Sequence, residues 1–200
     1  MPTEQELGMG RTRTFDTDAA VLAARETFWA RGFEETSVPD LEAATGLNRS
    51  SLYHSFGSKR GLFDAAVRSY LDEVIRPPLV PLMLDDVAPG ALQSYLERVA
   101  GWAGSAGQGN GCLLLNAAAG GLAHDETMSE GIRAYHAELL AALGRGVRAA
   151  RPNLDPKAAD ELAAELTGSV VAALLLVRVD PAAAEQLLRL AARRAEAAAS

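Results

Sequence analysis

The chain has few residues of the kinds that build disulfides, metal clusters or sheets. Cys112 is the only cysteine among 200 residues, which excludes an internal disulfide and any zinc or iron–sulfur site with several cysteine ligands. Aromatic residues make up 6% of the chain, and no stretch alternates polar with apolar residues as a strand does. The longest apolar runs, 170–177 and 112–115, are far shorter than the roughly 20 residues needed to span a bilayer. We therefore expect no membrane partner.

Signals for secretion and for catalysis are also missing. Glu4 and Glu6 occupy the N-terminal region, where a secretory signal would carry basic residues before an apolar run, so we expect a cytoplasmic protein. The histidines lack the spacing of metal ligands, and no nucleophile motif of a serine or cysteine hydrolase is present. These histidines are His54, His124 and His136. The sequence therefore predicts no cofactor, no metal and no enzymatic activity.

What the chain does contain favours helix. Hydrophobic residues make up 48%, with much alanine and leucine, and they recur at helical spacing. The pattern predicts an all-α fold of about nine helices, with residues 1–14 as a flexible arm and Pro77–Pro89 as a linker. The expected helices are 16–32, 37–46, 48–54, 59–75, 91–103, 112–122, 126–150, 156–177 and 181–195.

One segment runs against the net charge of −7. Between Ala43 and Phe63 there is no acidic residue, whereas Arg49, Lys59 and Arg60 lie there. The same region is predicted to form two short helices, 37–46 and 48–54, which are joined at Gly46 and packed together by three leucines. Short polar and cationic side chains at the start of the second helix suit the major groove of DNA. The segment therefore predicts a DNA-reading helix-turn-helix. The leucines are Leu41, Leu47 and Leu52.

A longer run makes this motif more specific. The sequence Leu-Tyr-His-Ser-Phe-Gly-Ser-Lys-Arg-Gly-Leu-Phe at 52–63 resembles the signature of the TetR family of bacterial regulators, and the match extends from Arg11 to about Tyr70. The resemblance implies a three-helix DNA-binding domain at 15–60, joined to a helical ligand-binding and dimerisation domain at 61–200. Glu42 departs from the pattern, because a small residue usually stands there. We expect Glu42 to point outward and Ala43 to supply the small packing surface.

The resemblance also assigns roles at the DNA. Arg49, Ser50 and Ser51 would probe base edges, with Arg49 best suited to a guanine. The phosphate backbone would be held by the residues that cap the start of helix 37–46 and by those that follow the reading residues, while two arginines of the arm reach a neighbouring groove or the backbone. These further DNA-contacting residues are Arg11, Arg13, Thr36, Ser37, Tyr53, His54 and Lys59.

Beyond residue 70 the resemblance is one of architecture. Polar or aromatic groups on apolar helices are candidates to line a ligand pocket, and the alternative for each is an ordinary core residue. These candidates are Tyr70, Tyr95, Trp102, Cys112, Asn116, Tyr135 and His136. The last two helices carry wide apolar stripes, which we expect to pair with those of a second copy. The stripe residues are Leu162, Leu166, Val170, Ala173, Val177, Leu187, Leu188 and Ala191.

Three hypotheses about function follow. The first is a homodimeric repressor that reads a palindromic double-stranded operator and is released by a small molecule. The second keeps the same DNA-binding end but uses Cys112 as a sensor of electrophiles or oxidants, because a cysteine that begins a helix can have a lowered thiol pKa. The third is a helical ligand-binding or scaffold protein that does not bind DNA.

Overall fold

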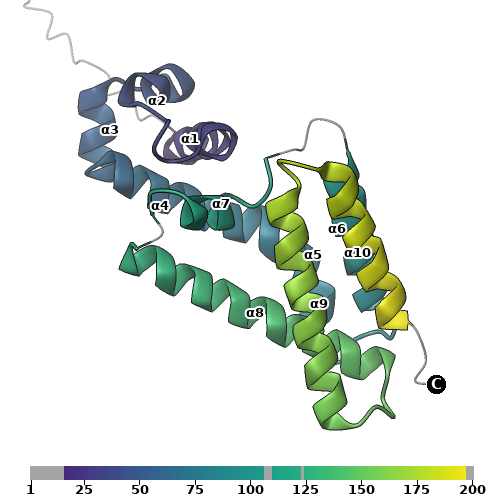
Figure 1. Ribbon diagram of the computed structural model, residues 1–200. Coiled ribbons are helices and arrows are strands. Elements are labelled where there is room, and N and C mark those ends of the chain that lie inside the picture. The colour runs from purple at the N-terminus through teal and green to yellow at the C-terminus, as the bar shows by residue number, and fades with distance from the viewer. Residues whose placement is uncertain (1–15, 106–109, 123, 197–200) are drawn as a thin grey trace, which may run out of the picture.

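The computed structural model describes residues 16–105, 110–122 and 124–196, so the predicted arm with Arg11 and Arg13 lies outside the described residues. Those residues form helices and contain no strand, as expected for an all-α fold (Figure 1). The elements are α1 (Thr17–Arg31), α2 (Val38–Thr45), α3 (Arg49–Phe56), α4 (Lys59–Tyr70), the π-helical turn η1 (Leu71–Ile75), α5 (Arg76–Met83), α6 (Ala91–Gly104), α7 (Leu113–Ala119), α8 (Glu126–Ala150), α9 (Pro156–Leu176) and α10 (Pro181–Glu196).

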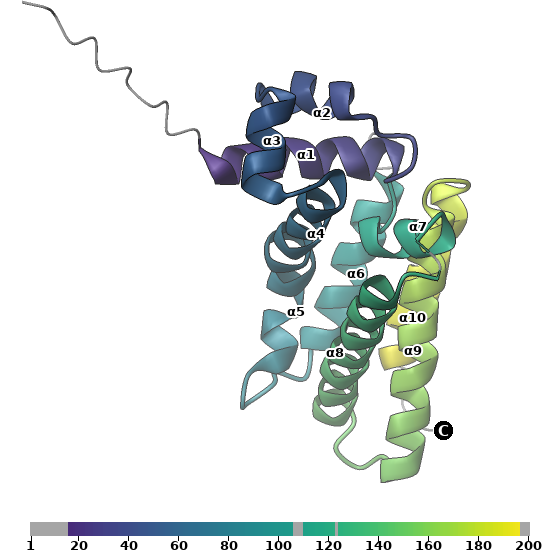
Figure 2. The same cartoon turned by 90° about the vertical axis from the view of Figure 1, so that its left-hand side faces the viewer.

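The first three helices gather at one end of the molecule, where α4 leads away from them (Figure 2). Each starts at a side chain that caps its free N–H groups: Asp16, Ser37 and Asn48. The turn from α2 to α3 needs Gly46, whose φ of 69° is costly for any residue with a side chain. α1 packs against α4 through an aromatic core with ring centroids 5.0 to 6.1 Å apart. That core consists of Phe28, Phe33 and Phe63.

The fourth helix does not end at Arg76, so the predicted linker Pro77–Pro89 is wrong over its first half. α4 continues through η1 and α5 to Met83. Pro77 and Pro78 lack N–H groups, but they lie in the first turn of α5, where that loss is tolerated. In η1 the Arg76 amide donates to the Leu71 carbonyl, five residues back, which widens this turn. With α4, η1 and α5 taken as one helix, the described residues form the nine helices expected.

α10 packs against both α6 and α9, and α9 also packs against α8 (Figure 1). This arrangement buries most of the side chains that were predicted to meet a second copy. Leu187 is half-buried, and the others pack inside their own chain, so any contact with another copy would fall to their exposed neighbours. The buried ones are Leu162, Leu166, Val170, Ala173, Val177, Leu188 and Ala191. No helix in the described ranges is both long and apolar enough to cross a membrane.

Two contacts hold the first three helices against the rest of the chain. The indole N–H of Trp29 on α1 donates to the Gly111 carbonyl at 2.8 Å in a buried position, and the Trp29 ring meets the Tyr70 ring edge-on with centroids 5.0 Å apart. At the other contact, Arg60 in the first turn of α4 donates two hydrogen bonds, each of 2.6 Å, to the carboxylate of Asp125. Asp125 also caps α8 through the Met128 amide, so this contact joins the starts of two helices.

The contact between Arg60 and Asp125 makes stability depend on pH. The hydrogen bonds from Arg60 lower the pKa of Asp125 from 3.8 to about 2. A carboxyl whose pKa is lower in the folded state stabilises that state above its unfolded pKa, and the stabilisation is lost as pH falls toward the folded value. We predict that Asp125→Asn, which can still cap α8, lowers the free energy of unfolding most at neutral pH. The loss relative to wild type should shrink between about pH 4 and pH 2.

Denaturant unfolding at a series of pH values measures this difference. Asp85→Asn is the matched control, because Asp85 is exposed after α5 and pairs with no described residue. Its effect should be small at every pH. A loss for Asp125→Asn that stayed constant down to pH 2 would show that the charge on Asp125 is not what stabilises the fold.

Candidate nucleic-acid interface and internal pocket

The start of α3 is stabilised by two side chains from outside the helix. The Asn48 side chain accepts from the Ser51 amide at 2.9 Å, and Glu42 on α2 accepts from the Arg49 amide at 2.5 Å. The expected role of Ala43 as the packing surface is wrong, because Ala43 is exposed. Glu42 instead turns toward α3, where its negative charge lies at the positive end of the helix dipole. The unusual residue therefore fixes the angle of α3 through a hydrogen bond.

α3 leaves several of its polar side chains in solvent. Arg49, Ser50 and His54 are exposed, while Ser51 and Tyr53 are half-buried. The Arg49 guanidinium stands 5.4 Å from the centroid of the Tyr53 ring, one helical turn further on, and this contact limits the directions in which Arg49 can point. All five residues predicted at this helix therefore lie together, with three of them fully available to a ligand surface.

The residues outside α3 that were predicted to contact DNA differ in their exposure and in their partners. Thr36 is fully buried and its hydroxyl donates to the Gly32 carbonyl at 2.6 Å, so its predicted contact with DNA is wrong for the side chain. Ser37 is exposed, but its hydroxyl is held by Asp40 at 2.6 Å in a capping box. The hydrogen bonds from Ser37 lower the pKa of Asp40 to about 2. Lys59 begins α4, with its ammonium 4.4 Å from the centroid of the Phe33 ring.

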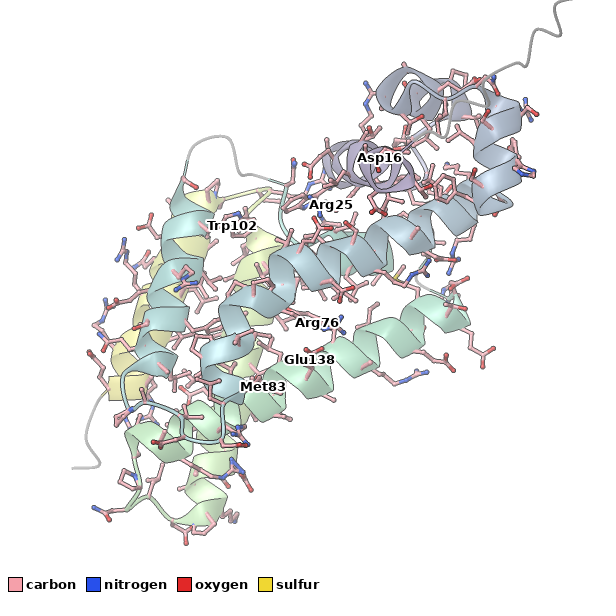
Figure 3. The ribbon with its side chains drawn as sticks, turned by 180° about the vertical axis from the view of Figure 1, so that it is seen from behind. Asp16, Arg25, Arg76, Met83, Trp102 and Glu138 are labelled. Carbon is pink, nitrogen blue, oxygen red and sulfur yellow. The ribbon has the colours of Figure 1, made fainter. Side chains whose placement is uncertain are left out.

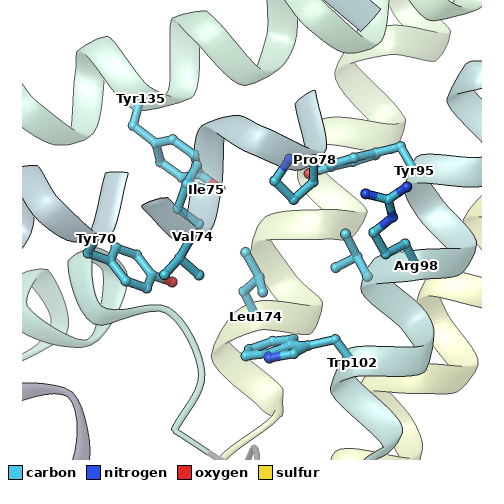
Figure 4. Close-up of a pocket in the computed structure, with 10 residues that line it drawn as sticks. Tyr70, Val74, Ile75, Pro78, Tyr95, Arg98, Trp102, Tyr135 and Leu174 are labelled. Atoms are coloured by element: carbon cyan, nitrogen blue, oxygen red, sulfur yellow. The ribbon is translucent and has the colours of Figure 1, made fainter. Parts of the chain in front are cut away.

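A cavity of about 170 Å³ lies between α4–η1–α5, α6, α8 and α9 (Figure 4). Tyrosines reach it from three different helices, and Trp102 and Arg98 come from α6. Burial raises the pKa of Tyr70, Tyr95 and Tyr135 above that of a free phenol, so their hydroxyls keep their protons at neutral pH. The full lining is Tyr70, Val74, Ile75, Pro78, Tyr95, Arg98, Val99, Trp102, Tyr135 and Leu174.

Four of the seven pocket residues predicted from the sequence are brought together here: Tyr70, Tyr95, Trp102 and Tyr135. Asn116 lies elsewhere, with its amide group donating to the Asn110 carbonyl at 2.6 Å. His136 is exposed and lines a second hollow between α7, α8 and α9. The sequence interpretation missed Arg98, which looked like any solvated helix position, and Pro78, which was assigned to a linker.

Cys112 lies beside the cavity without lining it. It is fully buried, and the Tyr70 hydroxyl is its side-chain hydrogen-bond partner. Burial raises the pKa of the thiol, and this outweighs the opposite effect of the amides at the start of α7. The expectation of a lowered thiol pKa is therefore wrong, because burial has a larger effect than the helix dipole. In the described part of the chain, no group of histidine, cysteine and acidic residues is arranged to hold a metal ion.

The sequence around α3 is similar to that of known bacterial regulators. Residues 21–66 match the family model for bacterial regulatory proteins of the tetR family. Over 108 residues the chain is 35% identical to the HTH-type transcriptional repressor ComR of Escherichia coli K12, covering 54% of this chain and 51% of ComR. It is 34% identical over 131 residues to the repressor BdcR of the same organism, covering 64% of each chain. The chain thus spans about half of one relative and less than two thirds of the other.

Similarity to a solved structure extends further along the chain. A cysteine mutant of the TetR family transcriptional regulator CifR, complexed with 26-bp double-strand operator DNA, superposes with a TM-score of 0.75 and is 28% identical. The match covers 93% of this chain and 98% of that one. It includes the helices that form the pocket as well as those around α3.

The burial of Cys112 leads to a prediction about its reactivity. We expect a thiol reagent such as Ellman's reagent to modify the native protein at least about a hundred times more slowly than the unfolded chain, because the reactive thiolate is scarce and shielded. The control is a Ser105→Cys, Cys112→Ser double variant, whose thiol lies at an exposed position. If native Cys112 reacted as fast as that exposed thiol, the case for an inert core cysteine would fail.

Proposed function

The chain belongs to the TetR family of bacterial regulatory proteins, and from this we propose that it is a ligand-responsive, DNA-binding transcriptional repressor that acts as a homodimer. Residues 15–60 would form the DNA-binding domain, and residues 61–200 the ligand-binding and dimerisation domain. The proposal includes no catalytic activity and no cofactor. It places the protein in the cytoplasm, where it would meet its operator.

The observation that carries the proposal is the exposed start of α3. Arg49, Ser50 and His54 point into solvent from a helix whose first turn is capped, and the positive end of its dipole faces the same way. No acidic residue lies between 43 and 63, although the whole chain has a net charge of −7. A surface of this kind can approach the phosphates that flank a major groove.

The relatives support repression and an operator as partner. ComR and BdcR are both named transcriptional repressors, and the CifR structure contains double-stranded operator DNA. One reading helix contacts few bases. Two copies with their reading helices about 34–36 Å apart would read a palindromic operator, which gives the specificity that one copy lacks.

We assign the effector to the cavity beside α4. α4 begins with Lys59 in the DNA-binding domain and ends at Tyr70 in the cavity wall, so one rigid helix touches both sites. A ligand that is bound better when α4 is tilted would shift the population of dimers toward a spacing of reading helices that does not fit the operator. Cys112 as a redox trigger is not favoured, because its thiol is buried.

For the dimer we propose the outward faces of α9 and α10. On α9 and in the turn that follows it, a stripe of small and apolar residues is exposed, and a Cβ added at Gly168 would meet nothing within 4 Å in its own chain. Small residues let two helices approach closely, and exposed leucine or valine beside them provides apolar area. The stripe consists of Ala164, Gly168, Ala172, Leu175 and Val179.

The DNA-binding proposal is tested with DNA from around the gene that encodes the chain. We expect salt-dependent, sequence-specific mobility shifts. Arg49→Ala should weaken specific binding by about 1–3 kcal/mol, and should relax preference at one base pair of each half-site. Lys59→Ala should instead weaken binding to all sequences alike and reduce the salt dependence by about one counterion.

Arg133→Ala serves as the matched control, because Arg133 is exposed on α8, away from α3. It should leave both affinity and salt dependence unchanged. Absence of any specific shift for the wild-type protein would overturn the proposal and favour a helical binding or scaffold protein. If Arg49→Ala changed DNA affinity no more than Arg133→Ala does, Arg49 would not be one of the residues that contact bases.

The dimer proposal is tested with Gly168→Arg. The new side chain has room in the single chain but would clash with a second copy across the stripe, so we expect monomers in sedimentation velocity where the wild type sediments as a dimer. Ala134→Arg on an exposed face of α8 is the control and should remain dimeric. If the Gly168→Arg protein remained dimeric and its dimer dissociation constant were unchanged, the interface would have to lie elsewhere.

A further inference from the structure

The size of the cavity beside α4 limits what it can hold. Its volume is about 170 Å³, close to that of an apolar cavity of roughly 150 Å³ that accommodates benzene. Most of its walls are aliphatic or aromatic side chains from α4–η1–α5 and α6, among them Val74, Val99 and Trp102. Flat, apolar walls of this kind suit one aromatic ring.

Arg98 determines which ligand charge is favourable in the cavity. Arg98 lines the cavity from α6, is exposed to solvent, and forms no ion pair with any described residue. No acidic residue is among the lining residues. Glu138 reaches Tyr135 electrostatically, but it does not line the cavity and accepts from Arg76 at 3.1 Å (Figure 3). A cation held among the aromatic rings would be repelled by Arg98, whereas a carboxylate would pair with it.

The tyrosines provide a second polar position. Tyr70 and Tyr135 come from α4 and α8 and lie across the cavity from Arg98, whereas Tyr95 comes from α6 and lies beside Arg98 (Figure 4). The Tyr70 hydroxyl is engaged by Cys112, but no described residue forms a hydrogen bond with the hydroxyls of Tyr95 and Tyr135. Protonated phenols can donate to a ligand oxygen and accept from a ligand hydroxyl. The free phenol of Tyr135, at the buried end of an apolar cavity across from Arg98, indicates a ligand with a polar atom there.

We propose that this cavity binds a single-ring aromatic acid with a hydroxyl group opposite its carboxylate, a molecule of the hydroxybenzoate type. The carboxylate pairs with Arg98, the ring lies against Trp102 and the aliphatic walls, and the ligand hydroxyl meets Tyr135. This ligand class rests on the proposed function, in which the same cavity takes the effector.

Isothermal titration calorimetry of the full chain tests the ligand class with para-hydroxybenzoate, benzoate and para-hydroxybenzamide, the neutral analogue. We expect para-hydroxybenzoate to bind most tightly. Arg98→Gln should weaken the two acids by about ten-fold or more and leave the amide unchanged, since a hydrogen bond to a charged group is lost only for the acids. Tyr135→Phe should weaken para-hydroxybenzoate more than benzoate.

Arg133→Gln is the matched control, because Arg133 is exposed and lines the second hollow, between α7, α8 and α9. It should not change binding of any of the three compounds. Equal affinity of acid and amide, an equal loss for both in Arg98→Gln, or a loss for Arg133→Gln alone would each overturn the proposal. So would the absence of measurable binding of either acid.

Mobility shifts with the same protein preparation separate this proposal from the proposed function. Specific DNA binding that para-hydroxybenzoate lowers in the wild type, but not in Arg98→Gln, supports both. Specific DNA binding without binding of the acids overturns the ligand class alone. Arg98-dependent binding of the acids without any DNA binding supports the ligand class and overturns the repressor.

Discussion

The buried hydrogen bond from the Trp29 indole to the Gly111 carbonyl determines how the DNA-reading helices sit on the rest of the chain. Trp29 belongs to α1, and its ring also packs on Tyr70, which forms part of the cavity wall. Leaving such a buried carbonyl without a partner costs about 1–3 kcal/mol, so the contact resists small displacements. A ligand that moves Tyr70 must therefore repack Trp29, and the two sites are coupled by direct contact as well as by α4.

Features that depend on neighbours in the sequence were predictable. The caps Asp16, Ser37 and Asn48 act on amides two or three residues away, and α8 begins and ends at the predicted residues, 126 and 150. The error at Pro77 has a local cause too. A proline pair is typical of a helix end, but it is also tolerated in a first turn, and the sequence does not say that η1 creates such a turn.

Features that depend on packing between distant segments were not predictable. Helical spacing shows that Val170 and Leu188 share an apolar face with their neighbours, but only the positions of α6 and α8 show that this face lies inside the chain. Cys112 and Thr36 are buried by segments distant in the sequence, so the sequence alone did not show that Thr36 turns inward or that burial raises the pKa of the Cys112 thiol. Arg98 could not be singled out, because its importance comes from the tyrosines that line the same cavity, two of them on other helices, and from the absence of a carboxylate among the lining residues.

The prolines after η1 have a mechanical consequence. Pro77, Pro78 and Pro81 cannot donate the backbone hydrogen bonds that stiffen a helix, so the carbonyls one turn before them lack their usual partners. α4 has no proline and is the stiffer part. When the cavity changes shape, bending should therefore concentrate at the junction of η1 and α5, and α4 should turn as a lever with its far end at Lys59. The junction of η1 and α5 lies on the side of the cavity away from α3. A small change of angle at this junction would therefore move α3 by a larger distance.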